Sequence, residues 1–173
     1  MPELAIGDWK EFQVSDILDY QKPRVYHKRE LISDADGVNY VTRTKFNNGV
    51  TDRVRSGNLE ELELNPAGVI SFGAENAKFF YQIEEFVSGR DIYYLETQSL
   101  TKNTALFLTT CLNSFTYKYS YNFGMFPEHV MAEEIKLPVS PSGRPDWDFM
   151  DSYMIATFEE LDGRLALLQS VIE

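Results

Sequence analysis

The 173-residue sequence has few of the features that place a protein outside the cell or in a membrane. It contains a single cysteine, Cys111, which cannot form an internal disulfide. No apolar run approaches the length of a membrane span, and the first residues lack the basic-then-apolar pattern of a signal peptide. We therefore expect a soluble, cytoplasmic protein with no membrane contact. Cys111 lies in the mostly apolar run 105–112, which favours a buried, inert thiol.

Enzyme motifs are scarce as well. The sequence has no glycine-rich phosphate loop of the Walker type, no G-x-S-x-G elbow and no cysteine–histidine motif. Each of the two histidines has only one glutamate at ligand spacing, so no metal site is expected. We therefore predict that the chain is not an enzyme and has no metal or cofactor of its own.

Positive charge is in short supply: 16 lysines and arginines stand against 27 aspartates and glutamates, giving a net charge of −11. Such a chain should bind DNA weakly by itself, because phosphate contacts dominate DNA affinity. The acidity is uneven, however, since the first third of the sequence is close to neutral. A local basic face remains possible there, with a more basic partner supplying much of the phosphate affinity.

The most informative segment is 39–55, NYVTRTKFNNGVTDRVR, which is basic and reads as a hairpin. Its first residues favour strand, and Asn48-Gly49 is a strong short-hairpin signal. Arginine and lysine can bind phosphate or guanine, and asparagine can pair with adenine. We predict DNA contact from this hairpin by Tyr40, Thr42, Arg43, Thr44, Lys45, Asn47, Asn48, Arg53 and Arg55. The alternative is a surface hairpin with ordinary solvated charges.

Two further groups are candidates for DNA contact. A basic cluster precedes the hairpin and contains Lys22, Arg24 and Lys28. Downstream, glutamine can read adenine, and lysine or tyrosine can reach phosphate. The downstream candidates are Tyr81, Gln82, Lys118 and Tyr119. For these the alternative is that the aromatic side chains simply pack against the sheet.

Alternating and apolar runs predict an α+β domain over residues 1–140, with a twisted, mostly antiparallel sheet and small peripheral helices. Strands are expected around 12–14 and at 67–72, 78–83, 91–95 and 134–139 in addition to the hairpin. A buried helix is expected at 103–115, a helical turn at 16–18 capped by Ser15, and a turn at 34–37.

Residues 141–173 differ in kind and predict a long C-terminal helix with Pro145 at its first position. Apolar residues recur at spacings of 4, 3, 4, 3 and 4, namely Met154, Phe158, Leu161, Leu165, Leu168 and Ile172. This 3.5-residue period is typical of a helix that pairs with a partner helix. The alternative is an amphipathic helix packed on its own domain.

Four stretches of the sequence together resemble a known family. They are WKEF at 9–12, YVTRT at 40–44 with NNGV at 47–50, VISFGAENAKFFYQ at 69–82, and IKLP at 135–138 with PDWDFM at 145–150. In order and spacing they are similar to one target-recognition half of a specificity subunit from type I, or related type IIB, restriction–modification systems. The resemblance spans nearly the whole chain.

The resemblance implies a non-catalytic protein that reads half of a bipartite site in double-stranded DNA. It would position a DNA adenine methyltransferase subunit, which binds S-adenosylmethionine, and a restriction or motor subunit would associate with the same complex. A complete subunit of that family has two recognition domains and two long helices, whereas this chain has one of each. The chain is then either a half-subunit that forms a homodimer through its C-terminal helix, which the heptad pattern favours, or an excised piece of a larger chain. The competing hypothesis is an acidic protein-interaction module of a defence or phage system.

Overall fold

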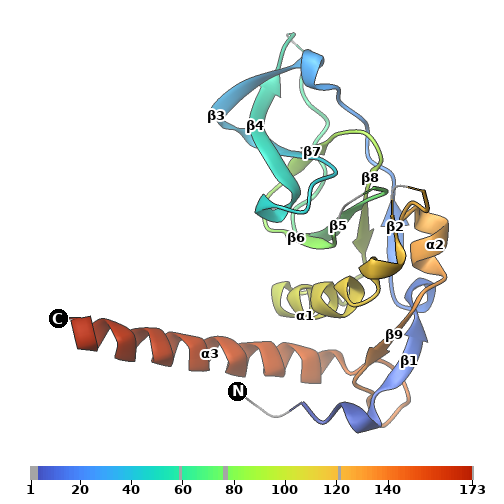
Figure 1. The fold of residues 1–173 in the computed structure, drawn as a ribbon, viewed down its shortest axis with the longest axis vertical. Coiled ribbons are helices and arrows are strands. Elements are labelled where there is room, and N and C mark those ends of the chain that lie inside the picture. Colours follow the sequence, from blue (N-terminus) through green and yellow to red (C-terminus); the bar gives the residue numbers. More distant parts are fainter. Residues whose placement is uncertain (1–3, 59, 76–77, 121, 173) are drawn as a thin grey trace.

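The computed structural model describes residues 4–58, 60–75, 78–120 and 122–172, with side chains described as far as Ser170. Nine strands and three α-helices are assigned within these residues. Figure 1 shows the hairpin of β3 and β4 on one side of helix α1 and the long C-terminal helix α3 on the other. The last turns of α3 extend beyond α1 and away from the strands.

The main core forms around a four-stranded sheet in the order β2-β8-β5-β6, in which every pair is antiparallel. Its strands are β2 (Asp19–Gln21), β8 (Ile92–Glu96), β5 (Val69–Gly73) and β6 (Phe80–Gln82). All five residues of β5 are buried. Helix α1 (Lys102–Asn113) begins at Thr101, whose hydroxyl accepts a hydrogen bond from the Thr104 amide, and it contributes its apolar residues to the same core.

A three-stranded sheet in the order β4-β3-β7 forms a second layer of structure. Strand β3 (Leu31–Val41) pairs antiparallel with β4 (Val50–Ser56) and parallel with β7 (Phe86–Ser88). Two small apolar clusters support it, one around Tyr40 and Val54 and the other around Val41 and Phe86. This sheet holds the predicted DNA-binding hairpin.

A two-stranded antiparallel sheet pairs a strand near the N-terminus with the strand that precedes the C-terminal helix. Strand β1 (Lys10–Gln13) pairs with β9 (Glu134–Leu137), which follows the short helix α2 (Pro127–Met131). Helix α3 (Trp147–Ile172) comes next in sequence. The N-terminal segment is therefore fixed beside the start of the long helix, as Figure 1 shows.

The prediction of an α+β fold with mostly antiparallel strands is confirmed, as are the strands that became β1, β5, β6, β8 and β9 and the helix that became α1. The strands are divided among three sheets instead of forming one. Strands β2 and β7 and helix α2 were not predicted. Each has only three to five residues, too few to show a periodic pattern.

Three local predictions were wrong. The turn at 34–37 is an excursion within β3, since Ser33 and Val38 both pair with Val54. Gly37 is needed there because a Cβ atom would lie 2.3 Å from the Val54 carbonyl oxygen. The helical turn begins earlier than expected, at Val14–Asp16, so Ser15 is inside it. The connection of β3 and β4 is also longer than a two-residue Asn-Gly turn, because it runs from 42 to 49.

Helix α3 begins two residues later than Pro145. Asp146 is its N-cap: its carboxylate accepts from the Phe149 amide at 2.9 Å, and its carbonyl accepts from the Met150 amide. Pro145 lies outside the helix, in an isolated bridge with Val139. Met150 is fully buried in the main core. The first turns of the helix are therefore part of the globular body, and the proposed domain boundary at residue 140 does not separate two cores.

Candidate nucleic-acid interface

The tip of the β3–β4 hairpin is its exposed part. Lys45, Phe46, Asn47 and Asn48 are all exposed, and the backbone of both asparagines has positive φ, at 47° and 54°. Asparagine adopts this left-handed conformation more readily than most residues. The Asn47 side chain donates to the Val50 carbonyl at 2.8 Å, which holds the tip in one conformation.

The tip is also tied to the central sheet. The Asn48 side-chain amide donates to the Tyr81 carbonyl at 2.8 Å. The Gln82 side chain in turn donates to the Asn48 carbonyl at 3.0 Å and to the Ser71 hydroxyl at 2.8 Å. Gln82 is only 1% exposed, so the prediction that it contacts DNA was wrong: it supports the tip from below. Tyr81 is half-buried against the main core.

The arginines of the hairpin are paired with carboxylates from other segments. The Arg43 guanidinium lies 2.7 Å from Glu75 and 3.3 Å from Asp91, with its side chain 27% exposed. Arg53 pairs with Glu84 at 3.0 Å and donates to the Gly37 carbonyl. Arg43 and Arg53 are therefore not free cations, and any DNA contact they make would compete with these acids.

Arg55 and the upstream basic cluster follow the same pattern in part. Arg55 lies 3.3 Å from Asp34, and Arg24 lies 3.8 Å from Glu63. Lys22 is exposed and forms no ion pair within the described part of the chain. Most of the cations that distinguish the hairpin in sequence are thus neutralised within the fold.

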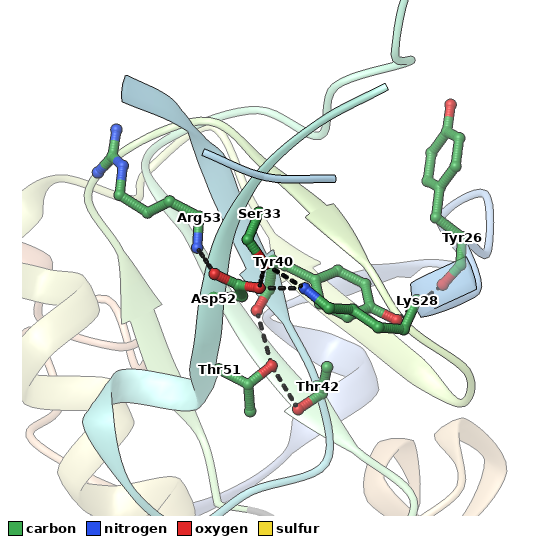
Figure 2. Close-up of polar contacts among 8 residues, drawn as sticks. All are labelled: Tyr26, Lys28, Ser33, Tyr40, Thr42, Thr51, Asp52 and Arg53. Carbon is green, nitrogen blue, oxygen red and sulfur yellow. Dashed lines mark hydrogen bonds and ion pairs between the residues drawn. The ribbon is translucent and has the colours of Figure 1, made fainter. Parts of the chain in front are cut away.

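Figure 2 shows polar contacts among residues of β3, β4 and the segments next to them. The Lys28 ammonium contacts the Asp52 carboxylate, which also accepts from the Ser33 hydroxyl at 2.6 Å. The hydrogen bond from Lys28, followed by that from Ser33, lowers the pKa of Asp52 below its usual value. Lys28 therefore joins the segment before β3 to β4, and its DNA contact remains a prediction.

Tyr40 lies in this network as a core residue. It is 7% exposed, and its hydroxyl donates to the Tyr26 carbonyl at 2.8 Å (Figure 2). Burial, with a smaller contribution from Glu30, raises the pKa of Tyr40. The prediction that Tyr40 contacts DNA was wrong, because its side chain points into the small core. Thr42 and Thr51 form a hydroxyl pair at 3.3 Å nearer the surface (Figure 2).

The downstream candidates form a second network after α1. The Tyr119 hydroxyl donates to Glu133 at 2.8 Å, and Lys118 pairs with the same carboxylate at 2.5 Å. Burial and this hydrogen bond raise the pKa of Tyr119. Tyr119 also stacks on Phe123, with ring centroids 5.6 Å apart. Its partly buried ring matches the packing alternative better than free contact with DNA.

Sequence reasoning missed a groove beside the hairpin tip. It has a volume of about 310 Å³ and is lined by Lys45, Ala74, Lys78, Thr116, Tyr117, Tyr119 and Met125. Lys78 and Tyr117 were not predicted because they come from separate connections that only the fold brings together. Both lysines are exposed. We call this feature the lysine groove.

The second half of α3 is exposed. Phe158, Leu161, Leu165 and Leu168 are 36%, 45%, 56% and 62% exposed, respectively. Met154 is half-buried against the main core, and the side chain of Ile172 lies outside the described residues. The stripe thus begins on the core. At Phe158 the Lys102 ammonium lies 5.9 Å from the ring centroid, and Leu161, Leu165 and Leu168 beyond it are exposed.

Two chemical features are absent from the part of the chain that the structure describes. No three histidine, cysteine or acidic side chains cluster as metal ligands would. None of the described helices is both long enough and apolar enough to cross a membrane.

The fold is that of restriction–modification specificity subunits. The HsdS subunit from Thermoanaerobacter tengcongensis superimposes with a TM-score of 0.59 at 13% identity, over 99% of this chain and 42% of that one. The type I S subunit from M. genitalium gives 0.56 at 10% identity, over 95% of this chain and 43% of that one.

Sequence comparison assigns the family. The model described as the type I restriction modification DNA specificity domain matches residues 6–169, so the chain belongs to this family. It therefore carries a DNA specificity domain of restriction–modification systems. The specificity subunit S.BcgI of a type II restriction enzyme from Heyndrickxia coagulans is 24% identical over 94% of this chain. The chain spans about half of that relative, 47% of its length. Nothing in these comparisons supports the hypothesis of an acidic protein-interaction module.

Proposed function

We propose that the chain reads one half-site in double-stranded DNA and positions a DNA adenine methyltransferase on it. The family match over residues 6–169 carries the proposal. The exposed hairpin tip supports it, because Asn47 and Asn48 are exposed and each is held by one side-chain N–H that donates to a backbone carbonyl. Their amide groups offer both donors and acceptors to base edges.

We further propose that two copies pair through α3 to form the complete specificity unit. The exposed stripe on α3 supports this proposal. Isologous pairing would relate the two recognition domains by a two-fold axis, so the site in DNA would be an inverted repeat around a fixed spacer. The same paired helices would carry the methyltransferase, and a restriction or motor subunit would join them in the cytoplasm.

Co-expression with the DNA methyltransferase encoded nearest to the chain tests this function. Sequencing that detects N6-methyladenine should reveal one bipartite motif that disappears when the specificity chain is left out. Methylation of the same motif by the methyltransferase alone would contradict the proposal. A triple variant of the tip, Lys45→Ala, Asn47→Ala and Asn48→Gly, should abolish or change the motif, and Asn48→Gly keeps the left-handed backbone accessible.

A further inference from the structure

The distribution of unpaired cations points away from the arginines of the hairpin. Arg43, Arg53 and Arg55 each lie within 3.3 Å of a carboxylate. By contrast, Lys45 and Lys78 form no ion pair with any residue that the structure describes. They come from different connections, that of β3 and β4 and that of β5 and β6, and yet they line one groove. In a chain of net charge −11, two unpaired lysines that line the same groove indicate a site for an anionic ligand.

Exposed aromatic rings flank these lysines. Tyr117 and Phe46 are 82% and 78% exposed, the highest values among the large apolar side chains of the described residues. Tyr117 lines the groove itself, and Phe46 follows Lys45 directly in the chain. Aromatic rings left in water beside cations are typical of surfaces that bind nucleic acid, where rings pack on sugars and bases. A simple inorganic anion would give these rings no role.

The groove is held rigidly from both sides. On one side, the Phe46 amide donates to the Thr44 hydroxyl, and the Gly49 amide donates to the Phe46 carbonyl. On the other side, the Asn113 side chain at the end of α1 accepts from the Phe79 amide at 3.1 Å and donates to the Phe79 carbonyl at 2.9 Å. This pair of hydrogen bonds fixes the segment of Lys78 relative to the 3-10 turn that carries Tyr117. Preorganised cations lose little entropy when they bind a ligand.

We propose that the lysine groove binds the phosphodiester backbone of duplex DNA. Lys45 and Lys78 neutralise phosphates of one strand, while Tyr117 and Phe46 pack against its sugars. The Asn47-Asn48 tip, which adjoins Lys45 in sequence, then faces the groove of the duplex next to that strand. This inference rests on the proposed function and assigns its phosphate-binding residues, two of which, Lys78 and Tyr117, lie outside the hairpin.

Salt-dependent binding of a random-sequence duplex to the full chain tests the inference. Each lysine lost from a phosphate contact should lower the slope of log affinity against log salt by about one. The double variant Lys45→Ala/Lys78→Ala should therefore lose about two from the slope and bind about 100-fold more weakly near 0.1 M salt. The matched control is Lys10→Ala/Lys136→Ala, which removes the same charge from exposed positions on the β1–β9 sheet. It should change the slope little.

The outcomes separate this inference from the proposed function. If the wild-type chain binds DNA but the groove variant binds equally well, the lysine groove is refuted and the DNA-reading function stands. If both double variants weaken binding alike, the effect is one of net charge and the inference is also refuted. A wild-type chain that binds no duplex at all, even at low salt, contradicts both.

Two additional arms identify the ligand. Tyr117→Ala should keep the salt slope and weaken binding by about tenfold, whereas Tyr117→Phe should bind like the wild type, since the ring makes the contact. Equal binding by all three would remove the aromatic contribution. Inorganic phosphate at millimolar concentration should not displace the duplex, and full displacement would show a simple anion site instead. Acetylation of the DNA-bound wild type should spare Lys45 and Lys78 but modify Lys10 and Lys136, a readout that needs no variant.

Discussion

The basic hairpin and the C-terminal helix both stand out in the sequence, yet in the fold the arginines of the hairpin are paired and the apolar side chains of the helix are exposed. The arginines of the hairpin are paired with Glu75, Asp91, Glu84 and Asp34, which lie in other parts of the chain or across a bulge. Within the described residues, the apolar stripe of α3 packs on the core at Met154 and is contacted by Lys102 at Phe158, and its residues then become more exposed as far as Leu168. The charges of the hairpin are thus paired within the fold, whereas the exposed stripe of α3 is the surface that we propose pairs with a second copy.

The difference shows what kind of sequence feature predicts an interface. A heptad stripe has a fixed geometry, because residues three and four apart lie on one face of any helix. An arginine has a long side chain that reaches acids far away in sequence, so its availability depends on the tertiary fold. Exposed apolar residues on α3 are therefore stronger evidence for a partner than the count of basic residues in 39–55 is for DNA.

Disrupting the α3 stripe should have the largest effect, a change in the oligomeric state. Leu161→Glu with Leu165→Glu should convert dimers to folded monomers, since burying each leucine is worth about 1.5–3 kcal/mol and a two-fold interface contains each twice. Sedimentation velocity measures the change. The matched control is Leu167→Glu, which is 69% exposed but off the stripe and should leave the dimer intact. A wild type that stays monomeric at high micromolar concentration would contradict the pairing of α3 with a second copy.

The two halves of α3 should respond differently to truncation of an apolar side chain. Met150 is fully buried, so Met150→Ala should lower the free energy of unfolding by about 2–5 kcal/mol. Leu161→Ala should change the stability of the monomer by less than about 0.5 kcal/mol, because that side chain is exposed. Urea denaturation of each variant, measured in a chain that is monomeric, gives the two changes in the free energy of unfolding. Equal losses would mean that the second half of the helix also packs on its own domain.

Beneath the hairpin tip, Gln82 should act on stability and only indirectly on DNA. Gln82→Leu removes the donor to the Asn48 carbonyl and the Ser71 hydroxyl, and it should cost about 1–3 kcal/mol in the free energy of unfolding. The remaining folded protein should prefer the same base at every position of its DNA site as the wild type does. Loss of preference at one position with full stability would instead show that Gln82 reads a base.

The smallest predicted effect concerns Lys28 and Asp52. Because the folded pKa of Asp52 is depressed, its ionised form contributes stability above the unfolded pKa near 3.8, and this is lost as the pH falls through the folded pKa. Lys28→Ala should raise the pKa of Asp52 toward 3.8, as followed by carboxyl NMR, so the pH-dependent loss of stability should become smaller and should be complete at a higher pH. Ser33→Ala should cause a smaller shift in the same direction. An unchanged pKa would mean that Lys28 is free for DNA.

Much of the fold could be predicted from the sequence because its main strands and helices are long enough to show their periods. The strand at 69–73, the helix at 102–113 and the long helix α3 were all predicted correctly within a few residues. The division into three sheets was not, since strands of three residues such as β2 and β7 have no distinctive pattern. The aspartates and glycine at 34–37 predict a turn, but these residue types also occur in a bulge such as the one that β3 forms there.

The candidate site was predicted less well than the fold. Lys45, Asn47 and Asn48 are exposed as expected, but Tyr40 and Gln82 are buried. Their burial follows from contacts with Tyr26 and Ser71, which no local pattern announces. Lys78 and Tyr117 were missed for the same reason, because they join Lys45 only after the β5–β6 connection and the end of α1 have packed together.

Selection of duplexes from a random pool by the full chain reports sequence reading and two-fold pairing together. We expect enrichment of an inverted repeat with a fixed spacer, reduced to single half-sites by Leu161→Glu/Leu165→Glu and recovered in much lower yield with Lys45→Ala/Lys78→Ala. A pool that emerges without any enriched motif, although the chain is folded and binds DNA, would contradict the claim that this domain reads sequence.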